Sequence, residues 1–133
     1  MAEPTNPNDF YIAPFSSRQK PGQDLDVAAP GVYTVGPYQL NSGSRLTYFF
    51  LSGTSMATPH VAGIVALMAQ KDAALTAPLA ETILEQSALR LGTGPVTITN
   101  PGGSTATLRW GTNATGAGLV QADKALTATP AIP

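Results

Sequence analysis

The chain has 133 residues, of which 43% are hydrophobic and 11% are charged, and its formal net charge is −1. This length and composition predict one globular domain with a hydrophobic core rather than a disordered chain. The small net charge excludes an electrostatic surface for nucleic acid and a polybasic patch for a membrane. The sequence contains no cysteine, so disulfides and thiolate metal sites are excluded as well.

The N-terminal third is rich in proline and in turn-forming residues. Its first nine residues have neither a basic segment nor an apolar run, so we expect no signal peptide there. Residues 25–29 form a short, mostly apolar run that stops at a Pro-Gly pair, and this pattern predicts a buried strand. A second short strand is predicted over residues 32–35, and a loop over residues 37–45.

The middle of the chain carries the strongest local signals. Residues 46–51 are β-branched and aromatic, which predicts a strand that ends before Gly53. Residues 55–70 lack Asp, Glu, Lys and Arg and are mostly apolar, which predicts a central, buried helix that is apolar on nearly all sides. The continuous apolar part of this helix, residues 61–69, is too short to span a bilayer. Pro59 falls in the first turns of the helix, where a missing N–H costs little.

The C-terminal third predicts a helix, a hairpin and another helix. Thr76 can cap the first of these helices, and Arg90 and Gly92 indicate where it ends. Two alternating runs flank a Pro-Gly-Gly turn within residues 96–110, and they predict a β-hairpin. A short helix is predicted over residues 121–126.

Ser55 is the candidate catalytic residue. A strand, a Gly-Thr turn and a helix place it at a helix N-terminus, where backbone N–H groups lack intrahelical partners and the dipole is positive. The N–H of Ser55 can therefore donate to a developing oxyanion, and such a donor lowers a barrier by roughly 2.7–4 kcal/mol. Serine is also a common N-cap residue, so the local chemistry alone leaves a structural role open.

The contiguous run from Gly53 to Gly63, GTSMATPHVAG, resembles the signature around the catalytic serine of the subtilases, the subtilisin-like serine proteases of peptidase family S8. Residues 15–17, followed by 25–32, resemble the segment that precedes this motif in the family. Residues 116–120, together with Ala122, resemble the closing element of the family. The three segments occur in the order of the family, so the resemblance covers most of the chain.

The resemblance implies an α/β fold and a domain organisation. Residues 1–128 would form the C-terminal part of a subtilase catalytic domain, and residues 129–133 a disordered tail. The family fold has three layers with a mostly parallel sheet, and the helix after Ser55 would be central and buried. Residues 93–112 would be a β-hairpin insertion beyond the compact members of the family.

The resemblance also implies a serine endopeptidase mechanism. Ser55 would attack the scissile carbonyl of a peptide or protein substrate and form an acyl-enzyme, and Thr54 would assist at the oxyanion. Leu51, Ser52 and Gly53 would border the substrate. We expect no cofactor, although the full-length enzyme could bind calcium. The resemblance to the family also implies a secreted protein.

The chain lacks residues that this mechanism needs. A serine hydroxyl requires a base that takes its proton. The only histidine, His60, is predicted to lie about 140° round the helix from Ser55 and about 7.5 Å further along its axis, as a buried structural residue. No counterpart of the catalytic histidine, catalytic aspartate or oxyanion asparagine of the family precedes Ser55. Asp26 does not match the catalytic aspartate either, and we expect a buried, hydrogen-bonded carboxylate there, with a weak cation site as the minor alternative.

We therefore expect the isolated chain to be inactive and marginally stable, and to need the N-terminal part of the catalytic domain. Three alternatives stay open: a truncated subtilase, a non-catalytic binding or assembly module derived from one, and a two-chain enzyme. An α/β-hydrolase is set aside, because Ala57 stands where the Gly-x-Ser-x-Gly motif needs its last glycine.

Overall fold

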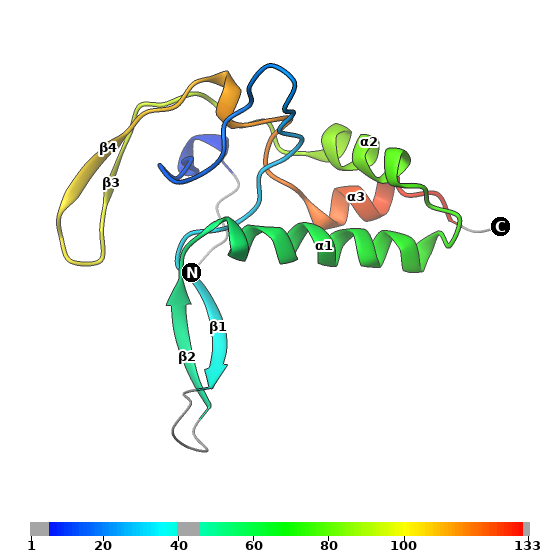
Figure 1. The fold of residues 1–133 in the computed structure, drawn as a ribbon, viewed down its shortest axis with the longest axis horizontal. Coiled ribbons are helices and arrows are strands. Elements are labelled where there is room, and N and C mark those ends of the chain that lie inside the picture. The colour runs from blue at the N-terminus through cyan, green and yellow to red at the C-terminus, as the bar shows by residue number, and fades with distance from the viewer. Residues whose placement is uncertain (1–5, 40–45, 132–133) are drawn as a thin grey trace.

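The computed structural model describes residues 6–39 and 46–131. The elements in chain order are the 3-10 helix η1 (Pro7–Asp9), strands β1 (Thr34–Gln39) and β2 (Leu46–Leu51), helices α1 (Thr54–Lys71) and α2 (Ala77–Ser87), strands β3 (Val96–Thr99) and β4 (Thr105–Leu108), the 3-10 helix η2 (Thr112–Ala114) and helix α3 (Ala122–Ala128). The three α-helices lie together, and the two hairpins extend from them in different directions (Figure 1). This mixture of helices and strands fits the α/β class.

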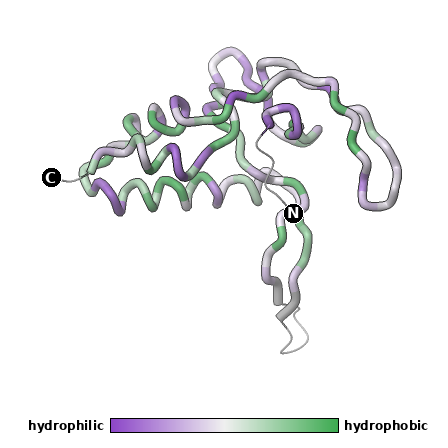
Figure 2. The backbone as a smooth tube through the Cα atoms, turned by 180° about the vertical axis from the view of Figure 1, so that it is seen from behind, coloured by the Kyte–Doolittle hydropathy of each residue, from purple (hydrophilic) through white to green (hydrophobic). Residues whose placement is uncertain are grey.

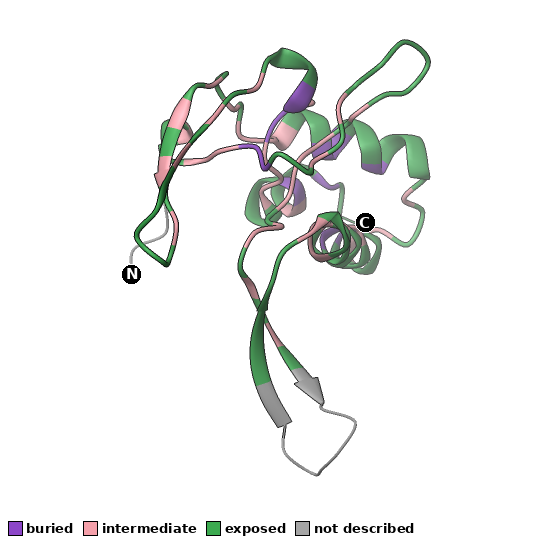
Figure 3. Cartoon of the chain, turned by 60° about the vertical axis from the view of Figure 1, so that its left-hand side comes forward, coloured by how far each residue is buried: buried purple, intermediate pink, exposed green. Residues whose placement is uncertain are grey.

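The hydrophobic core lies between the three α-helices. Ile64 and Met68 face it from α1, and Met68 is fully buried. The other buried members of this core are Ala80, Ile83 and Leu84 of α2 and Ala125 of α3. Residues three or four positions apart share one side of a helix, so α1 and α2 each contribute a narrow apolar stripe. Figure 3 shows buried segments on these helices and also on the short helix η2 and the coil beside it.

Helix α1 confirms the helix predicted after Gly53, but the prediction that this helix is central and buried is wrong for the described chain. Within α1 only Ile64 and Met68 are buried, and Leu67 is 46% exposed. Ala62 and Ala66 are exposed as well. The reason is that α3 packs against one side of α1, with α2 packed against α3, while the composition of α1 is apolar along most of its length (Figure 2).

The strands among the described residues form two antiparallel pairs rather than a mostly parallel sheet. In the first pair Thr34 of β1 lies opposite Leu51 of β2. The expected strand over residues 25–29 is reduced to one parallel bridge between Ala28 and Leu119. In the described part of the chain, Ala28 pairs with the residues around Leu119: its N–H donates to Gly118 at 2.8 Å and its C=O accepts from Val120 at 2.9 Å.

Several element boundaries differ from those predicted. The strand predicted over residues 32–35 begins at Thr34 and continues through part of the predicted loop to Gln39, while residues 40–45 lie outside the described residues. Helix α2 ends at Ser87 rather than near Arg90, because the N–H and C=O of Leu89 exchange hydrogen bonds with Leu119 at 2.8 and 2.9 Å.

The C-terminal end of the described chain is packed further than expected. Thr129 is buried, and its hydroxyl donates to the carbonyl oxygen of Ala125 at 2.8 Å. The disordered tail predicted over residues 129–133 therefore does not begin at Thr129, and residues 132–133 lie outside the described residues. No helix in the described part of the chain is long and apolar enough to cross a membrane.

The second hairpin has one polar and one apolar face. Thr97 of β3 pairs with Thr107 of β4, and their hydroxyl oxygens lie 3.1 Å apart on the exposed face. Val96, Ile98 and the residues opposite them are half-buried on the other face. At the base, the indole N–H of Trp110 donates to the carbonyl oxygen of Gly92 at 2.9 Å. The assignment of this hairpin as an insertion in the family fold stays a prediction.

Candidate active site

Ser55 occupies the second position of α1, where it is exposed. Gly53 is the N-cap residue of this helix, so the structural role of Ser55 as an N-cap is excluded. The N–H of Met56 already donates to the carbonyl oxygen of Gly53 at 3.0 Å. Among the described residues, neither the N–H nor the hydroxyl of Ser55 has a hydrogen-bond partner. The serine thus presents a donor and a hydroxyl to solvent at the positive end of a long helix.

The path of the chain into α1 is fixed by two hydrogen bonds. The N–H of Gly53 donates to the carbonyl oxygen of Gly31 at 2.8 Å, and the N–H of Tyr33 donates to Oγ of Ser52 at 2.9 Å. A Cβ on Gly31 would lie 2.9 Å from the oxygen of Gly53, so only glycine allows this close approach. The Ser52 hydroxyl therefore connects the end of β2 to the segment before β1. This structural contact adds to the predicted role of Ser52 at the border of the substrate site.

The other predicted site residues lie next to Ser55 in the same turn or strand end. Thr54 is exposed at the first position of α1, and its carbonyl oxygen accepts a hydrogen bond from Oγ1 of Thr58 at 3.0 Å. Leu51 ends β2 and is 42% exposed. The structure brings Leu51, Ser52, Gly53, Thr54 and Ser55 into one continuous exposed or half-exposed segment.

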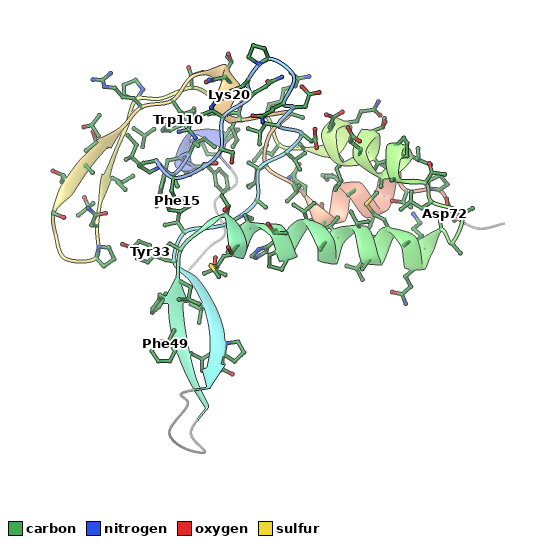
Figure 4. The ribbon with its side chains drawn as sticks, in the orientation of Figure 1. Phe15, Lys20, Tyr33, Phe49, Asp72 and Trp110 are labelled. Carbon is green, nitrogen blue, oxygen red and sulfur yellow. The ribbon has the colours of Figure 1, made fainter. Side chains whose placement is uncertain are left out.

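An apolar pocket of about 450 Å³ adjoins this segment. Gly53 and Thr54 form part of its wall, and residues of the N-terminal segment, among them Tyr11 and Phe15, line much of the rest. Burial raises the pKa of Tyr11 above its ordinary value of 10.0, and the charge that Tyr33 acquires on ionisation raises it further. Phe15 and Tyr33 lie near the point where the β1–β2 hairpin joins α1 (Figure 4). Sequence reasoning missed this pocket, because its walls come from segments far apart in the chain.

His60 is exposed, so the prediction that it is buried is wrong. Its Nδ1 lies 2.8 Å from the carbonyl oxygen of Met56 and must donate to it, since a carbonyl oxygen only accepts. The histidine is exposed because the described part of the chain covers α1 on one side only. His60 is bonded within its own helix, and it makes no hydrogen bond to Ser55.

Three carboxylates meet away from Ser55. Asp26, Glu81 and Glu85 each place an oxygen within 4.8 Å of the oxygens of the other two. The expectation of a buried carboxylate at Asp26 is wrong, because this side chain is exposed, as are the two glutamates. The four-residue spacing of the glutamates on α2 is the sequence signal for two of these three carboxylates. Oxygen ligands of this type suit a hard cation, but exposed carboxylates are common without one.

Comparison with known proteins identifies the family. Residues 5–121 match the family model described as the subtilase family. The chain is 44% identical over 71 residues to subtilisin DY of Bacillus licheniformis, which covers 53% of this chain and 24% of that protein. It is 40% identical over 104 residues to M-protease of Shouchella clausii, covering 78% of this chain and 21% of that protein. It is 38% identical over 112 residues to an extracellular protease of Xanthomonas campestris pv. campestris, covering 80% of this chain and 16% of that protein.

The chain thus spans less than a quarter of the length of these three proteins. Among solved structures, a serine protease of Aeromonas sobria aligns over 71% of this chain and 19% of its own, with a TM-score of 0.45 and 24% identity. The assignment rests on the family model and the sequence relatives, which include subtilisins and proteases. The chain belongs to the subtilase family.

Proposed function

We propose that this chain is the segment of a serine endopeptidase that carries the nucleophile, Ser55, and part of the oxyanion hole. The observation that carries the proposal is the exposed Ser55 in the second position of α1, with its N–H and its hydroxyl free of partners among the described residues. Membership of the subtilase family supports the same reaction, cleavage of peptide bonds in peptides or proteins.

In this mechanism Oγ of Ser55 attacks the scissile carbonyl carbon while a base takes its proton. The N–H of Ser55 donates to the carbonyl oxygen as negative charge develops there, assisted by the helix dipole and by the hydroxyl of Thr54. Collapse of the tetrahedral intermediate expels the amine, which receives the proton from the base, and leaves an acyl-enzyme that water hydrolyses. Acyl transfer of this kind requires no cofactor.

We further propose that the base and its orienting carboxylate come from the remainder of a longer catalytic domain. His60, the only histidine of the chain, is engaged with Met56, and the chain spans a small part of its relatives. The exposed side of α1 and the apolar pocket beside Gly53 are the surfaces on which this remainder would pack. Secretion is part of the same proposal, supported by the relative named as an extracellular protease.

The test is to label Ser55 with a fluorophosphonate, alone and in the presence of the missing part. The second polypeptide is taken from a subtilase and comprises its catalytic domain up to the segment that this chain matches. We expect negligible labelling of the chain alone, and labelling plus hydrolysis of a protein substrate after mixing. Ser55→Ala should abolish both, because loss of the serine from the triad of subtilisin costs roughly 10⁶-fold in kcat.

Ser104→Ala, at an exposed serine in the turn between β3 and β4, is the matched control and should retain labelling. Labelling at a residue other than Ser55, or hydrolysis by the Ser55→Ala variant, would contradict the proposal. A folded mixed complex that never reacts would favour the alternative, a non-catalytic binding or assembly module.

A further inference from the structure

The base of the β1–β2 hairpin changes register just before the chain enters α1. The hairpin register places Thr34 opposite Leu51. The next contact between the two segments is the hydrogen bond from the N–H of Gly53 to the carbonyl oxygen of Gly31. Between these two contacts one segment contributes two residues, whereas the other contributes only Ser52. Two residues opposite one is the arrangement of a β-bulge, which bends a strand and is common beside active sites.

The second residue of this bulge has a strained backbone. The two residues opposite Ser52 are Val32 and Tyr33, and Figure 4 shows Tyr33 where the hairpin joins α1. The φ angle of Tyr33 is 51°, in the left-handed region that bulky residues rarely adopt. Within the described part of the chain, no other residue except glycine has a positive φ. Such strain persists only where neighbouring contacts hold it, and it is concentrated at functional sites.

The side chain of Ser52 supplies the contact that holds this strained residue. The N–H of Tyr33 donates to Oγ of Ser52 at 2.9 Å, a side-chain acceptor rather than the carbonyl oxygen that a regular ladder supplies. The bond is exposed, so water can replace it and its net contribution to stability is small. Its main effect is therefore on geometry, because it keeps the bulge in one conformation.

The bulge is connected to Ser55 through Gly53. The N–H of Gly53 is bonded to Gly31, and its carbonyl oxygen accepts the N–H of Met56 at 3.0 Å. Ser55 lies between Gly53 and Met56 in the chain, so its N–H and its hydroxyl belong to a turn that is held at both ends. The conformation of the bulge sets the direction in which the chain leaves Ser52 and enters this turn.

We propose that Tyr33 and Ser52 are positioning residues, and that the bulge they form orients the hydroxyl and the N–H of Ser55 towards the scissile carbonyl. This inference rests on the proposed function, since it assigns the strain at Tyr33 to a catalytic geometry. It gives Ser52 a role that acts through Ser55, in addition to the predicted contact with substrate. A displacement of about 1 Å at a reacting group can cost roughly 100-fold in rate, so the bond matters far more for rate than for stability.

The first test separates rate from binding in the mixed complex of this chain with the N-terminal part of a subtilase catalytic domain. Fluorophosphonate labelling of Ser55 at several reagent concentrations gives a maximal rate constant and a half-saturating concentration. Ser52→Ala should lower the maximal rate roughly tenfold. The half-saturating concentration and the urea midpoint of the chain should change little, because the lost bond is exposed. Ser52→Thr keeps a hydroxyl acceptor and should recover most of the rate.

Two variants of Tyr33 show whether its backbone or its ring is responsible. Glycine adopts a positive φ freely, whereas β-branched valine resists it. Tyr33→Gly should therefore label at least about threefold faster than Tyr33→Val, although both variants lack the ring. Ser104→Ala is the matched control, because Oγ of Ser104 also accepts an exposed hydrogen bond, from Nδ2 of Asn100 at 3.1 Å in the other hairpin. This variant should leave the labelling rate unchanged.

Amide hydrogen exchange on the whole chain by itself gives a readout that needs no activity. Ser52→Ala should speed exchange at the N–H groups of Tyr33 and Gly53, while exchange in the helical core stays the same. Unchanged exchange, an unchanged labelling rate in Ser52→Ala, or an equal loss of rate in Ser104→Ala would overturn the positioning role.

The remaining outcomes distinguish this inference from its alternatives. A loss of rate in Ser52→Ala that follows a lower urea midpoint would mean that the bond only stabilises the fold, and the positioning role would fail. A change confined to the half-saturating concentration would leave Ser52 at the border of the substrate site alone. If exchange responds as expected but the complex with the unaltered chain never labels, the proposed function fails, and with it the catalytic role of the bulge.

Discussion

The two ends of helix α1 differ in how completely this chain surrounds them. Towards the C-terminal end, Ile64 and Met68 are buried against α2 and α3, and the Nζ of Lys71 donates to the carbonyl oxygen of Leu126 at 2.7 Å. At the N-terminal end, Ser55 is exposed beside an apolar pocket. One helix thus has a packed end that anchors it and an open end that carries the reactive group. The comparison teaches that the chain contains the support of the nucleophile but not its surroundings.

The largest effect on stability is expected at the packed end. Met68→Ala removes the most deeply buried large side chain, which leaves a cavity between the helices. The expected loss is about 2–5 kcal/mol in the free energy of unfolding, measured by urea denaturation. Leu67→Ala, at the neighbouring exposed position, should cost less than about 1 kcal/mol. Similar losses for the two variants would mean that Met68 is not held in a packed core at this end of α1.

A smaller effect is expected where the chain enters the open end. Gly31→Ala places a methyl group 2.9 Å from the oxygen of Gly53, and the backbone there must shift. We expect a loss of about 1–3 kcal/mol, typical of overpacking, together with weaker labelling of Ser55 in the mixed complex. Gly36→Ala is the control, because a methyl group there meets nothing within 4 Å. If Gly31→Ala leaves both quantities unchanged, the contact between residues 31 and 53 does not position the serine.

The sequence predicted the elements whose signals are local. The apolar composition of residues 55–70 and the aromatic run of residues 46–51 identified α1 and β2, and the motif beginning at Gly53 identified the family. These signals arise from residues close together in the chain, so they do not depend on what packs against them.

Features set by distant residues could not be predicted in this way. Helix α2 stops at Ser87 because Leu89 pairs with Leu119, thirty positions further on. The exposure of His60 depends on which elements cover α1, and its local pattern is equally compatible with burial. The pocket beside Gly53 likewise joins segments separated by some forty residues. Burial is a property of the whole fold, and a strongly apolar helix is buried only if its partners are present.

The smallest expected effect concerns Tyr11, in the wall of the pocket at the open end. Its pKa is raised because burial disfavours the charged phenolate and because ionised Tyr33 repels it. Below pH 10 the phenol is protonated in both the folded and the unfolded chain. Above that pH the unfolded chain loses the proton first, so stability falls as pH rises towards the folded-state pKa. Tyr11→Phe should therefore flatten this alkaline loss, measured as the urea midpoint against pH. Tyr48→Phe, at a phenol that is 75% exposed, is the control and should leave the slope unchanged.

If the remainder of the domain covers the pocket, adding it should bury Tyr11 further and steepen the loss of stability at alkaline pH. An unchanged slope in a complex that labels Ser55 would place the docking surface elsewhere on the chain.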